Sequence, residues 1–425
     1  MKYAAMNREQ LLAEKKAVEE QYSAYKAKDL SLNMARGKPT PEQVKTAEGL
    51  LTNIHDESDY ISEEGFDILN YGCLTGLVEC RRLLGDVYGI PADKIIIGNN
   101  SSLNLMFDYL MQCYAKGASK ESKPWLLQGD VKFLCVTPGY DRHFGITEYL
   151  GIQMVNVPMT EDGPDMDLVE KLVKDPMVKG MFCVPQYSNP TGNTYSDETV
   201  RRLAAMETAE DFRIIWDNAY AIHDLTNRRD RVLDLLSECE KAGHPERCVF
   251  FGSTSKVSIP GAGIAFIAAN EPNYSWILRR MKSQTIGADK INQMRHVKYF
   301  KNAEGVSRHM EELAEFITPR FEIVLNTFQR DLAESDVASW TDPNGGYFIS
   351  LDVMKGTAGR VYALCKEAGV TLTPVGATYP YGKDADDTNI RIAPTFPTEE
   401  DLQEATNVLV LCVKLAALEK LLEEN

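Results

Sequence analysis

Short apolar runs alternate with helical patterns between residues 94 and 268 of this chain. Such alternation is typical of βαβ units, in which helices cover both faces of a buried, largely parallel sheet. The sequence therefore predicts an α/β fold with a mostly parallel sheet sandwiched by helices. The expected strands are Lys94–Ile97, Phe133–Val136, Met154–Val157, Met181–Val184, Arg213–Trp216, Val249–Phe251 and Gly263–Ala268.

The pattern changes after about residue 300, which indicates a second, smaller α+β domain. A long polar helix is expected over Glu304–Arg330, strands over Gly345–Leu351 and Asn389–Ile392, and a closing helix over Glu399–Leu422. At the other end, a helix over Arg8–Ala27 precedes an irregular arm, Leu32–Pro41. We expect the helix and arm of residues 1–60 to join the small domain of residues 304–425, with a large domain over residues 61–303.

Charge and cysteine content narrow the class of protein. The net charge of −16, with no basic block, argues against nucleic-acid binding and favours small-molecule chemistry. The nine cysteines lack the spacing of zinc or redox sites, so we expect reduced core thiols and no metal site. Charged residues near the N-terminus argue against a secretory signal, and no segment predicts a membrane span. We expect a cytoplasmic protein.

One lysine follows a predicted strand in an unusual setting. Lys256 closes the segment Ser253–Lys256, directly after the run Val249–Phe251. Most lysines are solvated surface charges, and that is the ordinary explanation. The strand end and the serine hydroxyls favour a functional amine, because an amine held there can form an imine with an aldehyde cofactor. Ser253 and Ser255 could then donate hydrogen bonds to a phosphate.

A carboxylate, a phenol and an amide follow neighbouring strands. Asp217 ends the apolar run Ile214–Trp216, where an unpaired carboxylate is costly to bury. It could cap the next helix or pair with a protonated ring nitrogen of a cofactor. Tyr220 could be a core tyrosine or bind a ring oxygen, and Asn189 lies in a turn, Asn189–Gly192, in either case. Ligands gather at the carboxyl ends of strands in open α/β sheets.

The order of these motifs identifies a family. Asn189, Asp217, Lys256 and Arg391 are separated by 28, 39 and 135 residues (217 − 189, 256 − 217 and 391 − 256). Over nearly its whole length the chain resembles a pyridoxal-phosphate-dependent aminotransferase of class I/II and fold type I. The resemblance implies that Lys256 carries the cofactor as an imine and that Asp217 pairs with the pyridine nitrogen. It also implies that Asn189 and Tyr220 bind the ring oxygen, while Arg391 clamps the substrate α-carboxylate in a bidentate pair.

The resemblance extends to five further positions. Ser101 and Ser102 open a predicted helix whose free backbone amides suit a phosphate, although an ordinary serine cap would look the same. Tyr140 matches the aromatic that stacks on the cofactor ring, with simple packing as the alternative. Tyr71 matches a tyrosine that reaches the phosphate of the neighbouring subunit, which implies a homodimer with shared sites. Gly37 matches a glycine whose backbone covers the substrate carboxylate.

One departure from the family pattern concerns the phosphate. Many relatives place an arginine about eight residues after the lysine, and this chain has Ile264 there. Phosphate binding should therefore depend on serine hydroxyls, backbone amides and another cation such as Lys282. With the segments Asn33–Pro39, Tyr71–Gly76 and Tyr140–Phe144, this departure resembles a divergent bacterial subgroup often labelled aspartate aminotransferase.

A dicarboxylic substrate needs a second cation for its distal carboxylate. Arg142 is the first candidate, two residues after Tyr140, and Arg36 is the second. A surface salt bridge explains either arginine equally well. The expected reaction moves an amino group between aspartate or glutamate and a 2-oxo acid such as 2-oxoglutarate, with ping-pong kinetics.

Other functions remain open from the sequence. An aminotransferase for aromatic or other amino acids, or a pyridoxal-phosphate lyase or decarboxylase, would share the lysine constellation. A non-catalytic regulator would need a DNA-binding module, for which the N-terminal arm leaves no room. A nicotinamide dehydrogenase would need a complete Gly-x-Gly-x-x-Gly after a first strand, and Gly261-Ala262-Gly263 lacks the third glycine.

Overall fold

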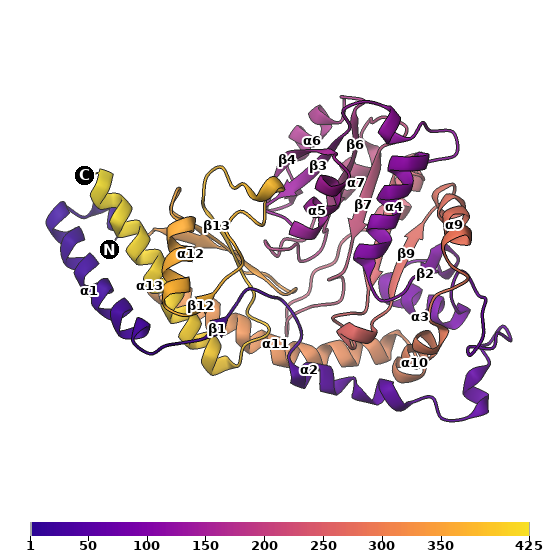
Figure 1. The fold of residues 1–425 in the computed structure, drawn as a ribbon, viewed down its shortest axis with the longest axis horizontal. Helices are drawn as coiled ribbons and strands as arrows, with labels where there is room; N and C mark the ends of the chain where they lie inside the picture. The colour runs from indigo at the N-terminus through magenta and orange to yellow at the C-terminus, as the bar shows by residue number, and fades with distance from the viewer. Residues whose placement is uncertain (1, 425) are drawn as a thin grey trace.

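A large sheet with helices on both faces dominates the computed structural model, which describes residues 2–424 (Figure 1). Within these residues its strands run in the order β2-β9-β8-β7-β6-β3-β4-β5. Their bounds are β2 Ile95–Ile97, β3 Lys132–Thr137, β4 Gln153–Thr160, β5 Gly163–Pro164, β6 Val178–Cys183, β7 Arg213–Asp217, β8 Cys248–Ser253 and β9 Ala265–Ala269. The helices of this part are α3 Val78–Tyr88, α4 Ser102–Lys116, α5 Asp141–Tyr149, α6 Met166–Leu172, α7 Asp197–Ala205, α8 Leu235–Lys241, α9 Asn273–Gln284 and α10 Lys290–Phe300.

The middle of this sheet is parallel, as the sequence predicts. Strands β4, β3, β6, β7 and β8 pair in parallel, whereas β9 pairs antiparallel with both β8 and β2. Parallel neighbours end at one edge of the sheet, so the segments that follow them lie together there. This edge carries Asp217, the last residue of β7, and Lys256, three residues after β8.

Two apolar cores cover the two faces of the large sheet. Along β7, Ile214 and Trp216 pack into one core, whereas Ile215 packs into the other. Alternate residues of a strand point to opposite faces, so a strand buried on both sides must be apolar throughout. This requirement explains the continuous apolar runs in the sequence and makes the sheet a rigid support for the segments at its edge.

A smaller sheet and a group of long helices form the other part of the molecule (Figure 1). In the described chain, β10 Ala338–Trp340, β11 Ile349–Val353 and β13 Asn389–Ile392 pair antiparallel, and β1 Leu32–Asn33 pairs in parallel with β12 Val370–Thr371. The helices are α1 Arg8–Lys26, α2 Pro41–Thr46, α11 Ala303–Asp331, α12 Ala358–Glu367 and α13 Glu399–Glu424.

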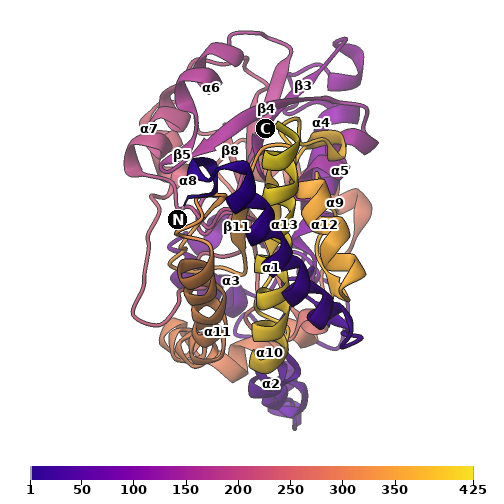
Figure 2. The ribbon, with the colours of Figure 1, turned by 90° about the vertical axis from the view of Figure 1, so that its left-hand side faces the viewer.

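The N-terminal helix packs against the C-terminal one. Helices α1 and α13 lie side by side, as Figure 2 shows from the end of the molecule. Tyr22 on α1 is buried, and its hydroxyl donates to the Leu364 carbonyl oxygen at 2.9 Å. The first and last segments of the chain therefore share one core, whereas the division at residues 60/61 and 303/304 stays a prediction.

Two sequence predictions for this part need correction. The strand expected over Gly345–Leu351 begins only at Ile349, because Gly346 has φ +85° and a Cβ there would approach Tyr187 to 2.9 Å. The arm expected to be irregular from Leu32 opens with the short strand β1. By contrast, the long helix, the closing helix and β13 lie where the sequence predicts them.

The prediction of core thiols is confirmed for eight of the nine cysteines, which are buried, whereas Cys73 is half-buried; the nine thiols all lie in the described chain and are free. Among residues 2–424, no helix is long and apolar enough to cross a membrane.

Candidate active site

Lys256 is held in a tight turn after β8. The Thr254 carbonyl oxygen accepts hydrogen bonds from the backbone amides of Val257 and Ser258 at 2.9 and 2.8 Å. Buried His296 fixes the other side of the turn, with Nε2 at 2.8 Å from Ser258 Oγ. The half-buried amine of Lys256 lies 5.0 Å from the ring centre of Tyr220. The turn therefore directs the amine inward, beside a predicted site residue.

Asp217 presents one bound and one unbound carboxylate oxygen. Its Oδ2 lies 2.9 Å from His143 Nε2, and both side chains are buried. His143 in turn stacks on Phe182, with ring centres 4.5 Å apart and planes inclined by 8°. Asp217 Oδ1 is buried without a hydrogen-bond partner in the described part of the chain. A buried carboxylate oxygen without a partner is costly, so it indicates a place for a cationic or donor group.

Tyr140 and Tyr220 lie near Lys256 and Asp217. The Tyr140 ring meets the His143 ring edge-on at 4.9 Å between centres. Burial raises the pKa of Tyr140 to about 12, and the nearby Lys256 charge opposes this shift. Burial also raises the pKa of Tyr220, with Asp217 adding to the effect and Arg391 opposing it. Both phenols therefore remain protonated hydrogen-bond donors at neutral pH.

Arg391 lies on β13 and reaches across to the large sheet. Its Nη1 donates to Asn189 Oδ1 at 3.3 Å and to Asp141 Oδ1 at 3.0 Å. The guanidinium also lies 5.0 Å from the ring centre of Phe348. Its Nε is buried and has no hydrogen-bond partner within residues 2–424. The predicted neighbours Arg391 and Asn189 thus meet, although the arginine also has an acidic partner that the sequence did not indicate.

Gly37 lies next to the Phe348 ring that Arg391 contacts. A Cβ at Gly37 would approach Phe348 ring carbons to 2.6 and 2.8 Å, so a larger residue has no space there. The arm is held to β13 by the Ala393 amide, which donates to the Met34 carbonyl oxygen at 3.0 Å. The arm therefore brings Gly37 and Arg391 to the same aromatic ring.

The predicted phosphate residues cluster at the start of α4. Ser101 Oγ caps this helix by accepting from the Asn104 amide at 3.3 Å, and Ser102 is its first residue. Ser255 Oγ donates to the Asn100 carbonyl oxygen at 3.1 Å, and Ser253 Oγ lies 2.9 Å from Ser255 Oγ. The serines of both motifs are therefore adjacent, and they lie beside a helix N-terminus whose backbone amides suit an anion.

Other predicted residues are exposed. The Arg142 side chain is 67% exposed, and Arg36 and Lys282 are exposed as well. Tyr71 is 82% exposed. Ile264 is buried in the core and offers no polar atom to a phosphate. Lys290 is a buried cation in this region, and its Nζ donates to the Gly72 carbonyl oxygen at 3.2 Å.

Sequence reasoning missed four residues of this site: Asp141, His143, His223 and Tyr347. Buried His223 lies beside the rings of Tyr220 and Tyr347, each 5.7 Å from it between centres. Burial lowers the pKa of His223 to about 3, and the Lys256 charge adds to this effect. Both histidines follow a predicted site tyrosine by three residues, at Tyr140 and Tyr220, and this spacing is a signal that could have revealed them.

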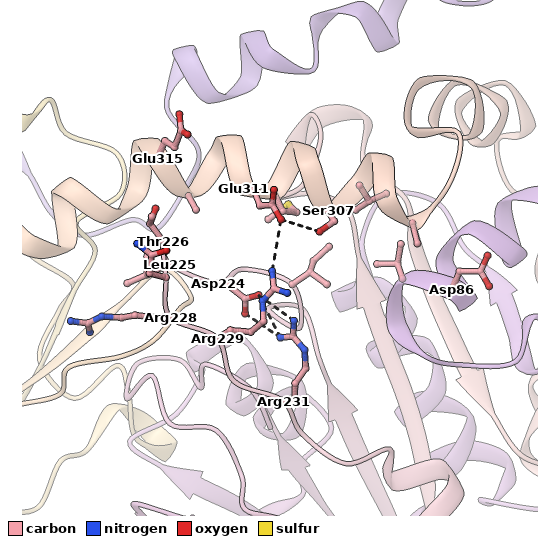
Figure 3. Close-up of a pocket in the computed structure, with 17 residues that line it drawn as sticks. Asp86, Asp224, Leu225, Thr226, Arg228, Arg229, Arg231, Ser307, Glu311 and Glu315 are labelled. Atoms are coloured by element: carbon pink, nitrogen blue, oxygen red, sulfur yellow. Dashed lines mark hydrogen bonds and ion pairs between the residues drawn. The ribbon is translucent and has the colours of Figure 1, made fainter.

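A separate hollow of about 580 Å³ lies between α11 and residues 222–231 (Figure 3). Arg229 Nε pairs with Asp224 Oδ2 at 2.9 Å, and Arg231 Nη1 pairs with Asp224 Oδ1 at 3.3 Å. None of the site residues predicted from the sequence is among the described residues that line this hollow. The hollow therefore lies apart from the candidate active site, and these two of its arginines are paired with a carboxylate.

Known proteins are similar to this chain in sequence and in fold. The family model for aspartate amino-transferase matches residues 6–425. The chain is 47% identical over 428 residues to a putative aminotransferase of Mycolicibacterium smegmatis, and 100% of each chain is covered. It is 45% identical to an aspartate aminotransferase of Corynebacterium glutamicum, over 95% of this chain and 93% of that protein. The crystal structure of an aspartate transaminase from C. glutamicum matches with a TM-score of 0.96 at 44% identity, covering 98% of both chains.

Fold, site and relatives together define an aminotransferase of fold type I. Within that class, the chain belongs to the aspartate amino-transferase family. The predicted fold and the predicted enzyme class are thereby confirmed, and the alternatives of a regulator and a nicotinamide dehydrogenase are excluded.

Proposed function

We propose that this aminotransferase binds pyridoxal phosphate at Lys256 and exchanges amino groups between aspartate or glutamate and a 2-oxo acid such as 2-oxoglutarate. One observation carries the proposal: the Lys256 amine beside Tyr220 and a buried Asp217 oxygen without a partner among the described residues lie at one strand-end edge, and Arg391 reaches toward that edge from β13 to contact Asn189. The names of relatives at 45% and 44% identity support aspartate as a substrate.

The residues present fit this cofactor. Lys256 would bind its aldehyde carbon, and Asp217 Oδ1 has the free acceptor capacity that a protonated ring nitrogen requires. Tyr220 and Asn189 would bind the ring oxygen, and Tyr140 would stack on the ring. Bound there, the cofactor would act as an electron sink for charge that develops at the substrate α-carbon.

Phosphate binding would rely on hydroxyl and amide donors. Ser253, Ser255, Ser101 and Ser102 lie beside the N-terminus of α4, where backbone amides and the helix dipole favour an anion. Ile264 cannot contribute, because its side chain is apolar and buried.

Particular residues of the site would bind the substrate and move its protons. Arg391 and Asn189 would bind and orient the α-carboxylate, with Gly37 covering it. Lys256 Nζ would take the proton from the substrate α-carbon and return one to complete the transfer. Asp217 would keep the ring nitrogen protonated, and His143 would hold Asp217 in place. The net exchange converts one amino acid to its 2-oxo acid and the second 2-oxo acid to its amino acid, so kinetics should be ping-pong.

The distal carboxylate of a dicarboxylic substrate would bind Arg142, with Arg36 as the second candidate. Both arginines are exposed, so a bound substrate would meet a mobile cation there and not a buried one.

An exposed apolar patch supports a homodimer with shared sites. Leu69, Tyr71 and Ile286 are 57%, 82% and 60% exposed. The segments that carry them are adjacent, since a Cβ at Gly287 would approach the Gly72 carbonyl oxygen to 2.4 Å. Exposed apolar patches commonly mark protein interfaces. Tyr71 would then reach the phosphate of the partner's site. The reduced thiols support a cytoplasmic enzyme.

A spectral screen of the twenty amino acids tests this proposal. Purified protein loaded with pyridoxal phosphate should change its cofactor absorbance with aspartate and glutamate at far lower concentrations than with other amino acids, and stoichiometric 2-oxo acid should appear. A preference for aromatic amino acids would overturn the proposed substrate. Release of carbon dioxide or ammonia in place of a 2-oxo acid would indicate a decarboxylase or lyase.

A further inference from the structure

Asp141 holds the arginine that should bind the substrate. Asp141 is the first residue of α5, and its Oδ1 accepts a hydrogen bond from Arg391 Nη1 at 3.0 Å. Its Oδ2 lies 4.0 Å from Arg142 Nε. The α-carboxylate of an amino acid carries the same two oxygens and the same charge as this side chain. Asp141 therefore has the chemistry of the group that Arg391 is expected to bind.

The position of Asp141 is fixed on both sides. Two residues before it, the Gly139 amide donates to the Thr378 carbonyl oxygen at 2.8 Å. Two residues after it, buried His143 binds Asp217 at 2.9 Å. A backbone hydrogen bond before Asp141 and a buried side-chain contact after it therefore place Asp141 against Arg391.

Asp141 supplies the negative charge that the largely buried Arg391 needs. The Arg391 side chain is only 10% exposed, so its charge is largely removed from water and needs a counter-ion. Asn189 contributes a neutral acceptor, whereas Asp141 contributes a full negative charge. An acidic residue in the first turn also stabilises α5 through the helix dipole, and this is the simpler role that the experiment must separate.

We propose that Asp141 is a built-in competitor of the substrate: it occupies the Arg391 clamp in the empty site, and every incoming α-carboxylate must displace it. This inference rests on the proposed function, because it takes Arg391 as the site of the α-carboxylate. Because the Asp141–Arg391 ion pair must be broken, it weakens the binding of amino acids and of 2-oxo acids alike, since both substrates carry an α-carboxylate. It therefore raises KM without a matching change in kcat.

The test compares Asp141→Asn with the wild-type holoenzyme. Asparagine keeps the shape of the side chain and removes its charge, so KM for aspartate and for 2-oxoglutarate should both fall about fivefold, with kcat unchanged. This factor is the difference between a charged and a neutral hydrogen bond, reduced because the Asp141 side chain is 34% exposed. Competitive inhibition by acetate should tighten by the same factor. Asp197→Asn is the matched control, because Asp197 is also the first residue of an exposed helix start, α7, and should change neither KM.

Arg391→Gln separates failure of this inference from failure of the proposed function. If Arg391→Gln raises KM and Asp141→Asn leaves it unchanged, the competitor role is wrong and the clamp stands. If Arg391→Gln leaves KM unchanged, the clamp itself is wrong. A rise of KM in Asp141→Asn for aspartate alone would also overturn the inference, since Asp141 would then bind the substrate amine. In the double variant, the fall in KM caused by Asp141→Asn should disappear.

Discussion

Replacing Asp217 by asparagine should remove most of the catalytic rate while leaving the fold intact. Asparagine can keep the contact with His143, whose Nε2 lies 2.9 Å from Asp217 Oδ2. It has no negative charge, however, so the atom at the position of Oδ1 could no longer pair with a cationic group. A hydrogen bond to a charged group contributes about 1.5–3 kcal/mol, and 1.36 kcal/mol corresponds to a factor of ten in rate. Loss of preorganised electrostatic stabilisation typically costs about 10²–10³ in kcat. We therefore expect kcat to fall by about 100-fold or more.

Stopped-flow absorbance of the half-reaction with saturating aspartate measures this rate directly. Asp217→Glu is the matched control, because it keeps the charge and should retain more activity than Asp217→Asn. Thermal melting should place both variants close to the wild-type protein. A half-reaction rate in Asp217→Asn equal to the wild-type rate would refute the role of the carboxylate, and a collapse of the melting temperature would instead show a structural role.

Two further predictions concern buried charges. Lys179 and Asp211 form an ion pair at 2.7 Å, and both side chains are buried. Lys179→Met leaves the aspartate charge without its lysine partner, so it should lower the apo-protein's free energy of unfolding by about 3 kcal/mol. A denaturant titration measures this change, and an unchanged free energy of unfolding would contradict the prediction. For His223, the folded pKa of about 3 lies below the ordinary value of about 6.5, so the unfolded chain binds a proton that the folded protein does not. Protonation of His223 in the unfolded chain should lower the free energy of unfolding by about 2 kcal/mol between pH 7 and pH 5. The loss between these two pH values should be about 2 kcal/mol smaller in His223→Phe. An equal loss in both proteins would contradict the lowered pKa of His223.

The sequence predicts seven strands of the large sheet to within a few residues, because a sheet buried on both faces leaves a continuous apolar pattern. It does not predict the two-residue strand β5, which has no such pattern. It cannot reveal the direction of β9, since an antiparallel strand buried on both faces shows the same apolar run as a parallel one. At the small sheet, the apolar residues before Ile349 suggest a longer strand, but the close approach of Gly346 to Tyr187 prevents it.

At the candidate site too, the sequence predicts local motifs but not the contacts between distant residues. The order of Asn189, Asp217, Lys256 and Arg391 suffices to name the family, and the structure brings Arg391 and Asn189 into contact. The pairing of Asp141 with Arg391 joins residues 250 positions apart, and no local pattern distinguishes that aspartate from any acid at a helix start. Such contacts follow from the packing of the two sheets.

Lys256 is the residue proposed to carry the cofactor. Borohydride reduction of the loaded protein, followed by proteolysis and peptide mass spectrometry, would fix any imine as a stable pyridoxyl-lysine and locate it in the sequence. We predict the modification on the peptide that contains Lys256, and its absence from the Lys256→Ala variant. A pyridoxyl group on another lysine, with Lys256 unmodified, would contradict the account.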